Sequence, residues 1–291
     1  MKIRRKGSDL VLDIVCYTLV ALLCLTIVIP FWNLFVTSVT PKSEYTLEFK
    51  WYPTVVDWGA WKIILSSKYM WICFKNTVVR TLLGTLISVL ITALYAYPLS
   101  RDEYQGNKFF TTIIMVTMFF GGGMIPLYLT ISDLGLMDTV WSMVLPSALS
   151  AFNVIVLKNF FKQLPNGLIE AAKIDGANDI YILFKIVMPL SLPILATITL
   201  WQLVSHWNAW FDCLLYIQDR ERYVLQIMLR ELKESVDAIT SGAAGVSASD
   251  APPSESVIAS SNLFVIAPIV FSYPFLQKYF VKGLTVGGVK G

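Results

Sequence analysis

Charged side chains are absent from six long stretches of this chain, and that pattern sets the expectation for its fold. The stretches are residues 14–41, 81–100, 109–132, 139–157, 186–211 and 256–277. The shortest has 19 residues, and about 20 helical residues cross the hydrocarbon core of a bilayer. Because lipid offers the backbone no hydrogen-bond partners, each crossing must be helical. We therefore predict an all-α, polytopic membrane protein with six transmembrane helices.

The charged and turn-forming residues around these stretches give approximate helix boundaries. The six helices are expected at about 10–39, 72–100, 108–131, 138–162, 183–217 and 258–282. Residues 1–9 form a short basic tail, and residues 10–291 form one transmembrane domain. Two longer polar connections remain, a loop at 163–182 and an excursion at 218–257.

The excursion at 218–257 has two parts of different character. Apolar residues recur at helical spacing from Leu225 to Val236, which predicts a short amphipathic surface helix. Residues 238–256 are rich in Ala, Ser and Gly, a composition typical of a mobile linker.

Composition and charge support a membrane protein and suggest its orientation. The chain is 56% hydrophobic and only 15% charged, whereas soluble domains carry about 25% charged residues. Six crossings place both termini on one side. If that side is the cytoplasm, inner segments carry 13 Lys and Arg and outer segments 9, with Arg80 left inside a helix. We expect both termini in the cytoplasm, and Arg80 reaching towards the interface.

Residue patterns for enzymatic or metal chemistry are missing from the sequence. It has no Gly-x-x-x-x-Gly-Lys phosphate loop, no credible catalytic triad or carboxylate pair, and a single histidine, His206. The four cysteines lie in or near apolar stretches without close pairing, as expected for packing residues. We predict a non-catalytic chain that binds no cofactor and no metal, and the net charge of +3 gives no indication of nucleic acid.

Three consecutive glycines, Gly121 to Gly123, interrupt the third predicted helix. Glycine lowers helix propensity by about 1 kcal/mol relative to alanine. A break inside a membrane is tolerable only where protein or water satisfies the backbone. The glycines therefore predict either a hinge or pathway lining, or a close approach of two helices.

A short polar island, Glu170 to Ala177, separates two apolar stretches and has its own local structure. Gly176 suits the end of a short helix, because a left-handed closing residue costs glycine little. Asn178 or Asp179 can cap a second helix. The island is thus predicted as helix, turn, helix at a membrane surface, with small alanines that allow a partner to approach closely.

This island resembles the EAA loop of binding-protein-dependent ABC importer permeases. The residues at the family spacing are Glu170, Ala171, Ala172, Gly176, Ile186 and Pro189. Met188 stands where the family usually has Leu. The extension Asp175-Gly176-Ala177 is similar to the carbohydrate-uptake branch of the family.

The resemblance implies a fold, a function and a set of partners. It implies a type I ABC importer transmembrane domain that couples to a cytoplasmic ATPase through its EAA loop. The coupling residues would be Glu170, Ala171, Ala172, Asp175, Gly176 and Ala177. The implied partners are a second homologous permease, two ATPase subunits that hold ATP and Mg²⁺, an extracytoplasmic solute-binding protein, a sugar and membrane lipid.

Polar and aromatic side chains crowd the later turns of the fifth predicted helix. They are Gln202, Ser205, His206, Trp207, Asn208 and Trp210. Polar side chains in membrane helices usually face an interior or a cavity, so these residues are candidates for half of a sugar pathway. Hydrogen bonding between helices is the alternative, and Trp207 and Trp210 can also serve as interfacial anchors. The resemblance suggests an oligosaccharide from a degraded polysaccharide that contains uronate or rhamnose.

Two other classes of function stay open at this point. A stand-alone secondary carrier or channel would need titratable residues inside its helices or inverted repeats. Here His206 is the one titratable residue deep in an apolar stretch, and no repeat is visible. A scaffold subunit without transport is the third possibility.

Overall fold

The computed structural model of the protein describes residues 7–41, 44, 49–240 and 255–287, and the regular elements in those ranges are all helices. This confirms the predicted all-α fold. The chain divides into two compact units. The first comprises Met1–Ser67 with Leu229–Ile266, and the second comprises Lys68–Met228 with Ala267–Gly291.

The first unit contains a long apolar helix whose buried residues, among those described, lie near its C-terminal end. Its helices are α1 (Gly7–Ser38), α2 (Gly59–Ser66) and, continuing across the division, α13 (Leu225–Thr240) and α14 (Glu255–Gly287). Trp61 Nε1 donates to Ser38 Oγ at 3.3 Å, and Ser260 Oγ donates to the Ser38 carbonyl at 3.2 Å. In contrast, no residue in the most apolar window of α1 is buried.

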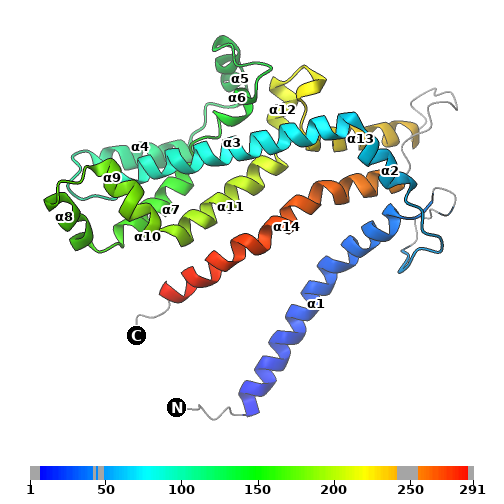
Figure 1. Ribbon diagram of the computed structural model, residues 1–291, viewed down its shortest axis with the longest axis horizontal. Coiled ribbons are helices and arrows are strands. Elements are labelled where there is room, and N and C mark those ends of the chain that lie inside the picture. Colours follow the sequence, from blue (N-terminus) through cyan, green and yellow to red (C-terminus); the bar gives the residue numbers. More distant parts are fainter. Residues whose placement is uncertain (1–6, 42–43, 45–48, 241–254, 288–291) are drawn as a thin grey trace. The chain divides into compact units, whose positions relative to one another are not determined.

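The second unit is built around α3. Its elements are α3 (Lys68–Leu99), α4 (Asn107–Phe119), α5 (Met124–Asp133), α6 (Val140–Val144), α7 (Ala151–Lys162), α8 (Asn166–Ile174), α9 (Asp179–Ile182), η2 (Leu183–Val187), α10 (Met188–Leu190), α11 (Leu192–Asn208), α12 (Phe211–Tyr216) and η3 (Arg220–Arg222). In Figure 1, α4, α7 and α11 lie along α3. Ala93 and Ala96 on α3 are fully buried, and such small side chains let neighbouring helices approach closely.

The third predicted helix, 108–131, is not continuous. It consists of α4 and α5, which are bent by 112° at the glycine break. Gly123 has φ +86°, which glycine adopts readily. A Cβ on Gly121 or Gly122 would meet no atom within 4 Å, so close packing among the described residues does not explain these glycines. Instead they border a cavity of about 710 Å³, which is also lined by α5, α6 and α12.

The fifth predicted helix, 183–217, is also corrected by the structure. The chain bends by 87° between the part that ends at Leu190 and α11. Pro189 and Pro193 have no amide hydrogen, so two helical hydrogen bonds are missing around the bend. Just before it, η2 winds as a π-helix. Beyond the bend, α11 ends at Asn208, and the rest of the predicted range forms α12 and the residues that join it to α11.

The fourth predicted helix, 138–162, is divided into α6 and α7. Pro146 lies between the two and cannot donate a backbone hydrogen bond to extend α6. Ser150 then caps α7, because its Oγ accepts a hydrogen bond from the Asn153 amide at 3.4 Å. The predicted continuous helix is therefore replaced by two short ones.

The excursion at 218–257 contains the predicted surface helix, now defined as α13. Leu225 and Met228 are buried, in agreement with an amphipathic helix. Within the predicted linker 238–256, residues 241–254 lie outside the described residues.

Several helices are long and apolar enough to cross a membrane. Among the described residues these are Val11–Ser38, Lys68–Leu99 and Glu255–Ser272, and counting each bent helix pair as one span gives five. The divided segment 138–162 would have to supply a sixth. The arrangement with six crossings stays a prediction.

Candidate functional site

The helix–turn–helix predicted for the polar island is present. Helix α8 ends at Ile174, and Gly176 follows with φ +82°. The Ala177 amide donates to the Ala172 carbonyl at 2.9 Å, and the Gly176 amide donates to the Lys173 carbonyl at 3.0 Å. These two bonds form a Schellman motif, in which a glycine closes the helix in the left-handed conformation.

The second helix of the island begins at a side-chain cap. Of the two predicted capping residues, Asn178 takes the role, because its Oδ1 accepts a hydrogen bond from the Tyr181 amide at 2.8 Å. Asp179 instead accepts a hydrogen bond from the Tyr97 hydroxyl of α3 at 3.3 Å. One residue thus starts α9, and the next links it to α3.

The predicted coupling residues fall into a packed group and an exposed group. The packed members are Ala172 and Ala177, which lie against the core in which their neighbour Ile169 is buried. The exposed members are Glu170, Ala171, Asp175 and Gly176. Ile174, at the end of α8, is 86% exposed and gives this face a large apolar contact point. The exposed group is therefore available to a partner.

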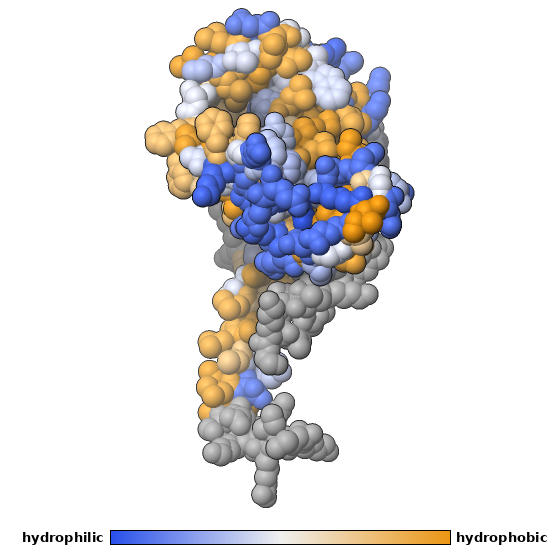
Figure 2. Space-filling view, turned by 90° about the vertical axis from the view of Figure 1, so that its left-hand side faces the viewer, coloured by the Kyte–Doolittle hydropathy of each residue, from blue (hydrophilic) through white to orange (hydrophobic). Residues whose placement is uncertain are grey.

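Two ion pairs link the loop after α3 to the elements around the polar island. Lys173 Nζ lies 2.8 Å from Glu103 Oε2, and Lys162 Nζ lies 2.8 Å from Asp102 Oδ1. The hydrogen bonds from the two lysines lower the pKa of Glu103 and of Asp102, and the bond to Glu103 raises the pKa of Lys173. Hydrophilic surface is prominent at this end of the unit (Figure 2).

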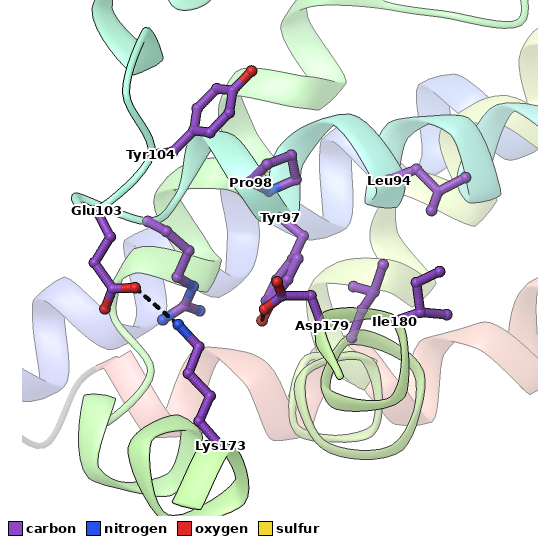
Figure 3. A pocket seen from close by; sticks show the side chains of 10 residues that line it. Leu94, Tyr97, Pro98, Glu103, Tyr104, Lys173, Asp179 and Ile180 are labelled. Carbon is purple, nitrogen blue, oxygen red and sulfur yellow. Dashed lines mark hydrogen bonds and ion pairs between the residues drawn. The ribbon is translucent and has the colours of Figure 1, made fainter. Parts of the chain in front are cut away.

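A cavity of about 370 Å³ lies between the end of α3 and the helix–turn–helix. Figure 3 shows Tyr97 and Asp179 on one side of it and the Glu103–Lys173 pair on the other. Leu94 and Ile180 provide apolar lining. Both helices of the polar island thus take part in one mixed polar and apolar site.

Arg80 lies inside the second unit. Its side chain is 1% exposed and forms an ion pair with Asp212, and its Nη1 donates to the Ala209 carbonyl at 3.0 Å. The prediction that Arg80 reaches towards the interface is therefore wrong. A buried charge needs a counter-charge and hydrogen bonds, and the residues after α11 supply both.

The structure separates the predicted pathway residues by the face of α11 on which they lie. Gln202 and His206 are buried: Gln202 donates to Ser88 of α3, and the His206 ring lies against Gly84. Ser205 and Asn208 are exposed on this chain.

The two tryptophans of that set differ in their surroundings. Trp207 is buried and makes an edge-to-face contact with Phe74, with ring centroids 6.2 Å apart. Trp210 is half-buried and packs against the small core around Cys213. The alternative of hydrogen bonding between helices thus describes Gln202. Trp207 makes a ring contact with α3 instead, while Ser205 and Asn208 remain accessible.

Sequence reasoning did not identify Glu103, Tyr97 or Asp212 as parts of these sites. Each is paired with a residue at least 70 positions away. Local spacing carries no signal for such pairs. The only hint was the presence of a charged residue, Arg80, in an apolar segment, since an ion in such surroundings requires a partner.

The fold and the site together define a helical membrane protein with an exposed polar helix–turn–helix. The family model described as "binding-protein-dependent transport system inner membrane component" matches residues 73–286. The polygalacturonan/rhamnogalacturonan transport system permease protein YtcP of Bacillus subtilis is 36% identical over 280 residues, covering 96% of this chain and 98% of that protein. Protein LplC of the same organism is 36% identical over 265 residues, covering 91% and 90%.

A solved structure agrees with these relatives. A chain in the crystal structure of a bacterial ABC transporter that imports the acidic polysaccharide alginate has a TM-score of 0.83 and 32% identity, covering 96% of this chain and 100% of that chain. The protein therefore belongs to the family of binding-protein-dependent transport system inner membrane components, and it is a multi-pass membrane protein.

Proposed function

We propose that this chain is the permease subunit of an ATP-driven importer and forms half of the pathway for an oligosaccharide released from a polysaccharide. The observation that carries the proposal is the exposed face of α8, where Glu170, Ala171 and Ile174 are accessible next to a helix end fixed by Gly176. Within this family, such a face is suited to a groove on an ATPase.

In this proposal the chain transmits motion and performs no catalysis. Two ATPase subunits in the cytoplasm would hold ATP and Mg²⁺, and their closure would displace α8. Since α9, η2 and α10 connect α8 to the bend before α11, a displacement of α8 would reach α11. Through this connection, nucleotide bound to the ATPase would shift the permease between two conformational states. In the predicted orientation, with both termini in the cytoplasm, α8 would lie on the side of the ATPase.

The sugar pathway would lie between this chain and a second, homologous permease. Ser205 and Asn208 are the predicted pathway residues that a sugar can reach on this chain, whereas Gln202, His206 and Trp207 would hold α11 in place. The transport system of the relative YtcP is described as one for polygalacturonan and rhamnogalacturonan, and the structural neighbour takes part in import of alginate. These names support a substrate with uronate or rhamnose units, delivered by an extracytoplasmic binding protein.

The test is ATP hydrolysis by the assembled transporter in lipid. The chain is co-expressed with its second permease and ATPase, and hydrolysis is measured with and without binding protein loaded with oligogalacturonate. We expect stimulation that falls about tenfold in Glu170→Ala, a size typical of coupling between sites. Gln163→Ala, an exposed change just before α8, is the control. If the ATPase does not co-purify and Glu170→Ala transports normally, the chain acts as a stand-alone carrier instead.

A further inference from the structure

The helix–turn–helix is held against the end of α3 at two separate points. Lys173 of α8 pairs with Glu103, four residues beyond the end of α3, at 2.8 Å. Asp179, the first residue of α9, accepts the hydrogen bond from Tyr97 near the end of α3 at 3.3 Å. Each helix of the element therefore has its own polar contact with α3 or its loop.

Between these two contacts lies the cavity of about 370 Å³ shown in Figure 3. Where atoms are not in contact, apolar packing cannot fix the distance between the elements. Arg101 stiffens the α3 side, because its guanidinium lies over the Tyr97 ring at 5.3 Å and donates to the Phe161 carbonyl at 3.5 Å. Ile169, Ala172 and Ala177 pack the helix–turn–helix against the core beside this cavity. The polar contacts at the edges of the cavity add a direct link from α8 and α9 to α3 and its loop.

We propose that Glu103 is a positioning residue of the coupling loop, holding α8 to the end of α3 through Lys173, so that displacement of α8 reaches α3 directly. This inference rests on the proposed function, because it assigns a second route to the same coupling element. The first route is covalent and runs through α9, η2 and α10 into α11. The second is the ion pair from α8 to the loop after α3.

A direct route to α3 matters because α3 and α11 share one closely packed interface. Gln202 and His206 of α11 meet Ser88 and Gly84 of α3. If only α11 moved, these contacts would be sheared. If α8 moves both helices together, the contacts between α3 and α11 are kept, and the rearrangement takes place elsewhere along the pathway.

The neighbouring pair supplies a matched control. Asp102 pairs with Lys162 at the same 2.8 Å and is similarly exposed, with 79% exposure of the carboxylate side chain compared with 74% for Glu103. Lys162 ends α7, however, and is not part of α8. Exposed ion pairs add little to folding stability, so neutralising either carboxylate should leave the protein folded.

The functional test uses the complete transporter in lipid with binding protein loaded with oligogalacturonate. Glu103→Gln and Lys173→Gln should each lower stimulated ATP hydrolysis and sugar uptake by about three- to tenfold, the range for residues that modulate coupling. The exchange variant Glu103→Lys with Lys173→Glu should restore both to near the native level. Asp102→Asn should leave both unchanged.

A structural readout separates position from activity. Spin labels at Asn166 of α8 and at Gln105 of the loop, both exposed, report their distance in the same transporter. The distance distribution should broaden in Glu103→Gln and narrow again in the exchange variant. High salt should broaden the native distribution, because about 1 M salt reduces the screening length to ~3 Å.

The two proposals fail in different ways. A native transporter without stimulation by loaded binding protein would overturn the proposed function. Normal stimulation in the native transporter together with unchanged Glu103→Gln and Lys173→Gln would overturn the role of Glu103. An exchange variant as defective as the single variants would also overturn it, because the charges would then not act on each other.

Discussion

Individual side chains in the second unit are placed by close contacts between α3 and α11. Gly84 is the clearest case, because an added Cβ would lie 2.5 Å from both Cε1 and Nε2 of His206. His206 is 3% exposed, so its ring is surrounded by other groups of the folded chain. Glycine at this position is thus required by its neighbour, and His206 acts here as a packing residue.

We expect Gly84→Ala to destabilise the protein by about 1–3 kcal/mol, the usual cost of overpacking a core. Thermal unfolding in lipid nanodiscs measures it. Gly121→Ala is the control, since a Cβ there meets nothing within 4 Å. In a His206→Ala background, adding Gly84→Ala should cost much less stability, because the ring that the new methyl group would meet is gone. A stable Gly84→Ala would contradict the contact.

At the scale of single elements, the closing turn of α8 determines how the polar island is presented. Gly176 lets the chain reverse within two residues, and the Schellman bonds satisfy the carbonyls of Ala172 and Lys173. Asn178 then starts α9 without a gap. The element is short, so a single backbone change can alter all of it.

Gly176→Ala should loosen this turn, because an alanine in the left-handed region costs about 1–2 kcal/mol. Hydrogen exchange of the peptide over residues 166–178 is expected to accelerate about five- to thirtyfold, which is the same energy expressed as an opening equilibrium. Gly167→Ala is the matched control within α8, where φ is ordinary and a Cβ meets nothing within 4 Å. Its exchange should be unchanged or slower, as alanine favours helix. Equal acceleration in both variants would argue against the turn.

The Glu103–Lys173 pair should respond to pH only at the extremes. The pKa of Glu103 is lowered from 4.5 by its bond to Lys173, so its contribution is present above that value and is lost as pH falls through the lowered pKa. The pKa of Lys173 is raised from 10.5, so its contribution is lost only as pH rises beyond that value. The width of the spin-label distance distribution should be constant between these limits and should increase in acid. In Glu103→Gln, acid should not widen the distance distribution further. A distribution that already widens near neutral pH in the native chain would show that the ion pair does not hold α8.

At the scale of the whole molecule, much of the apolar surface is exposed on this chain. The most apolar window of α1 has no buried residue, although its composition would favour burial. In water such a surface would cause aggregation, whereas lipid or another membrane subunit can cover it. This exposure agrees with a chain that is one component of a membrane assembly.

Cysteine labelling tests the predicted orientation. Cys16 and Cys24 are exposed on the apolar helix α1, which lipid would cover, and Cys73 and Cys213 are buried. A membrane-impermeant maleimide should therefore not label the native chain in intact membranes. Gln218→Cys, on an exposed loop, should label only from outside. Asn166→Cys, on α8, should label only in inverted vesicles. The reverse pattern would place α8 outside the cell and remove its access to an ATPase.

The parts of this molecule that could be predicted from sequence are those whose cause is local. The turn at Gly176 and the cap at Asn178 depend on residues within a few positions of them. The break at Gly121–Gly123 was predicted as one of two alternatives, because the glycines themselves mark it. The bend before α11 was predicted as a continuous helix, since a charge-free stretch indicates burial in lipid and says little about missing backbone bonds. The pairs Arg80–Asp212 and Glu103–Lys173 could not be predicted, because they join distant segments that only the folded helices bring together.

The glycine break between α4 and α5 has a consequence for proton leakage across the membrane. Backbone groups at such a break need protein or water as partners, and the adjacent cavity of about 710 Å³ has room for water. A water-filled path along this cavity would conduct protons if it ran continuously from one face of the membrane to the other. In a cell that stores energy as a proton gradient, the idle transporter must therefore keep a water-free barrier elsewhere along this path.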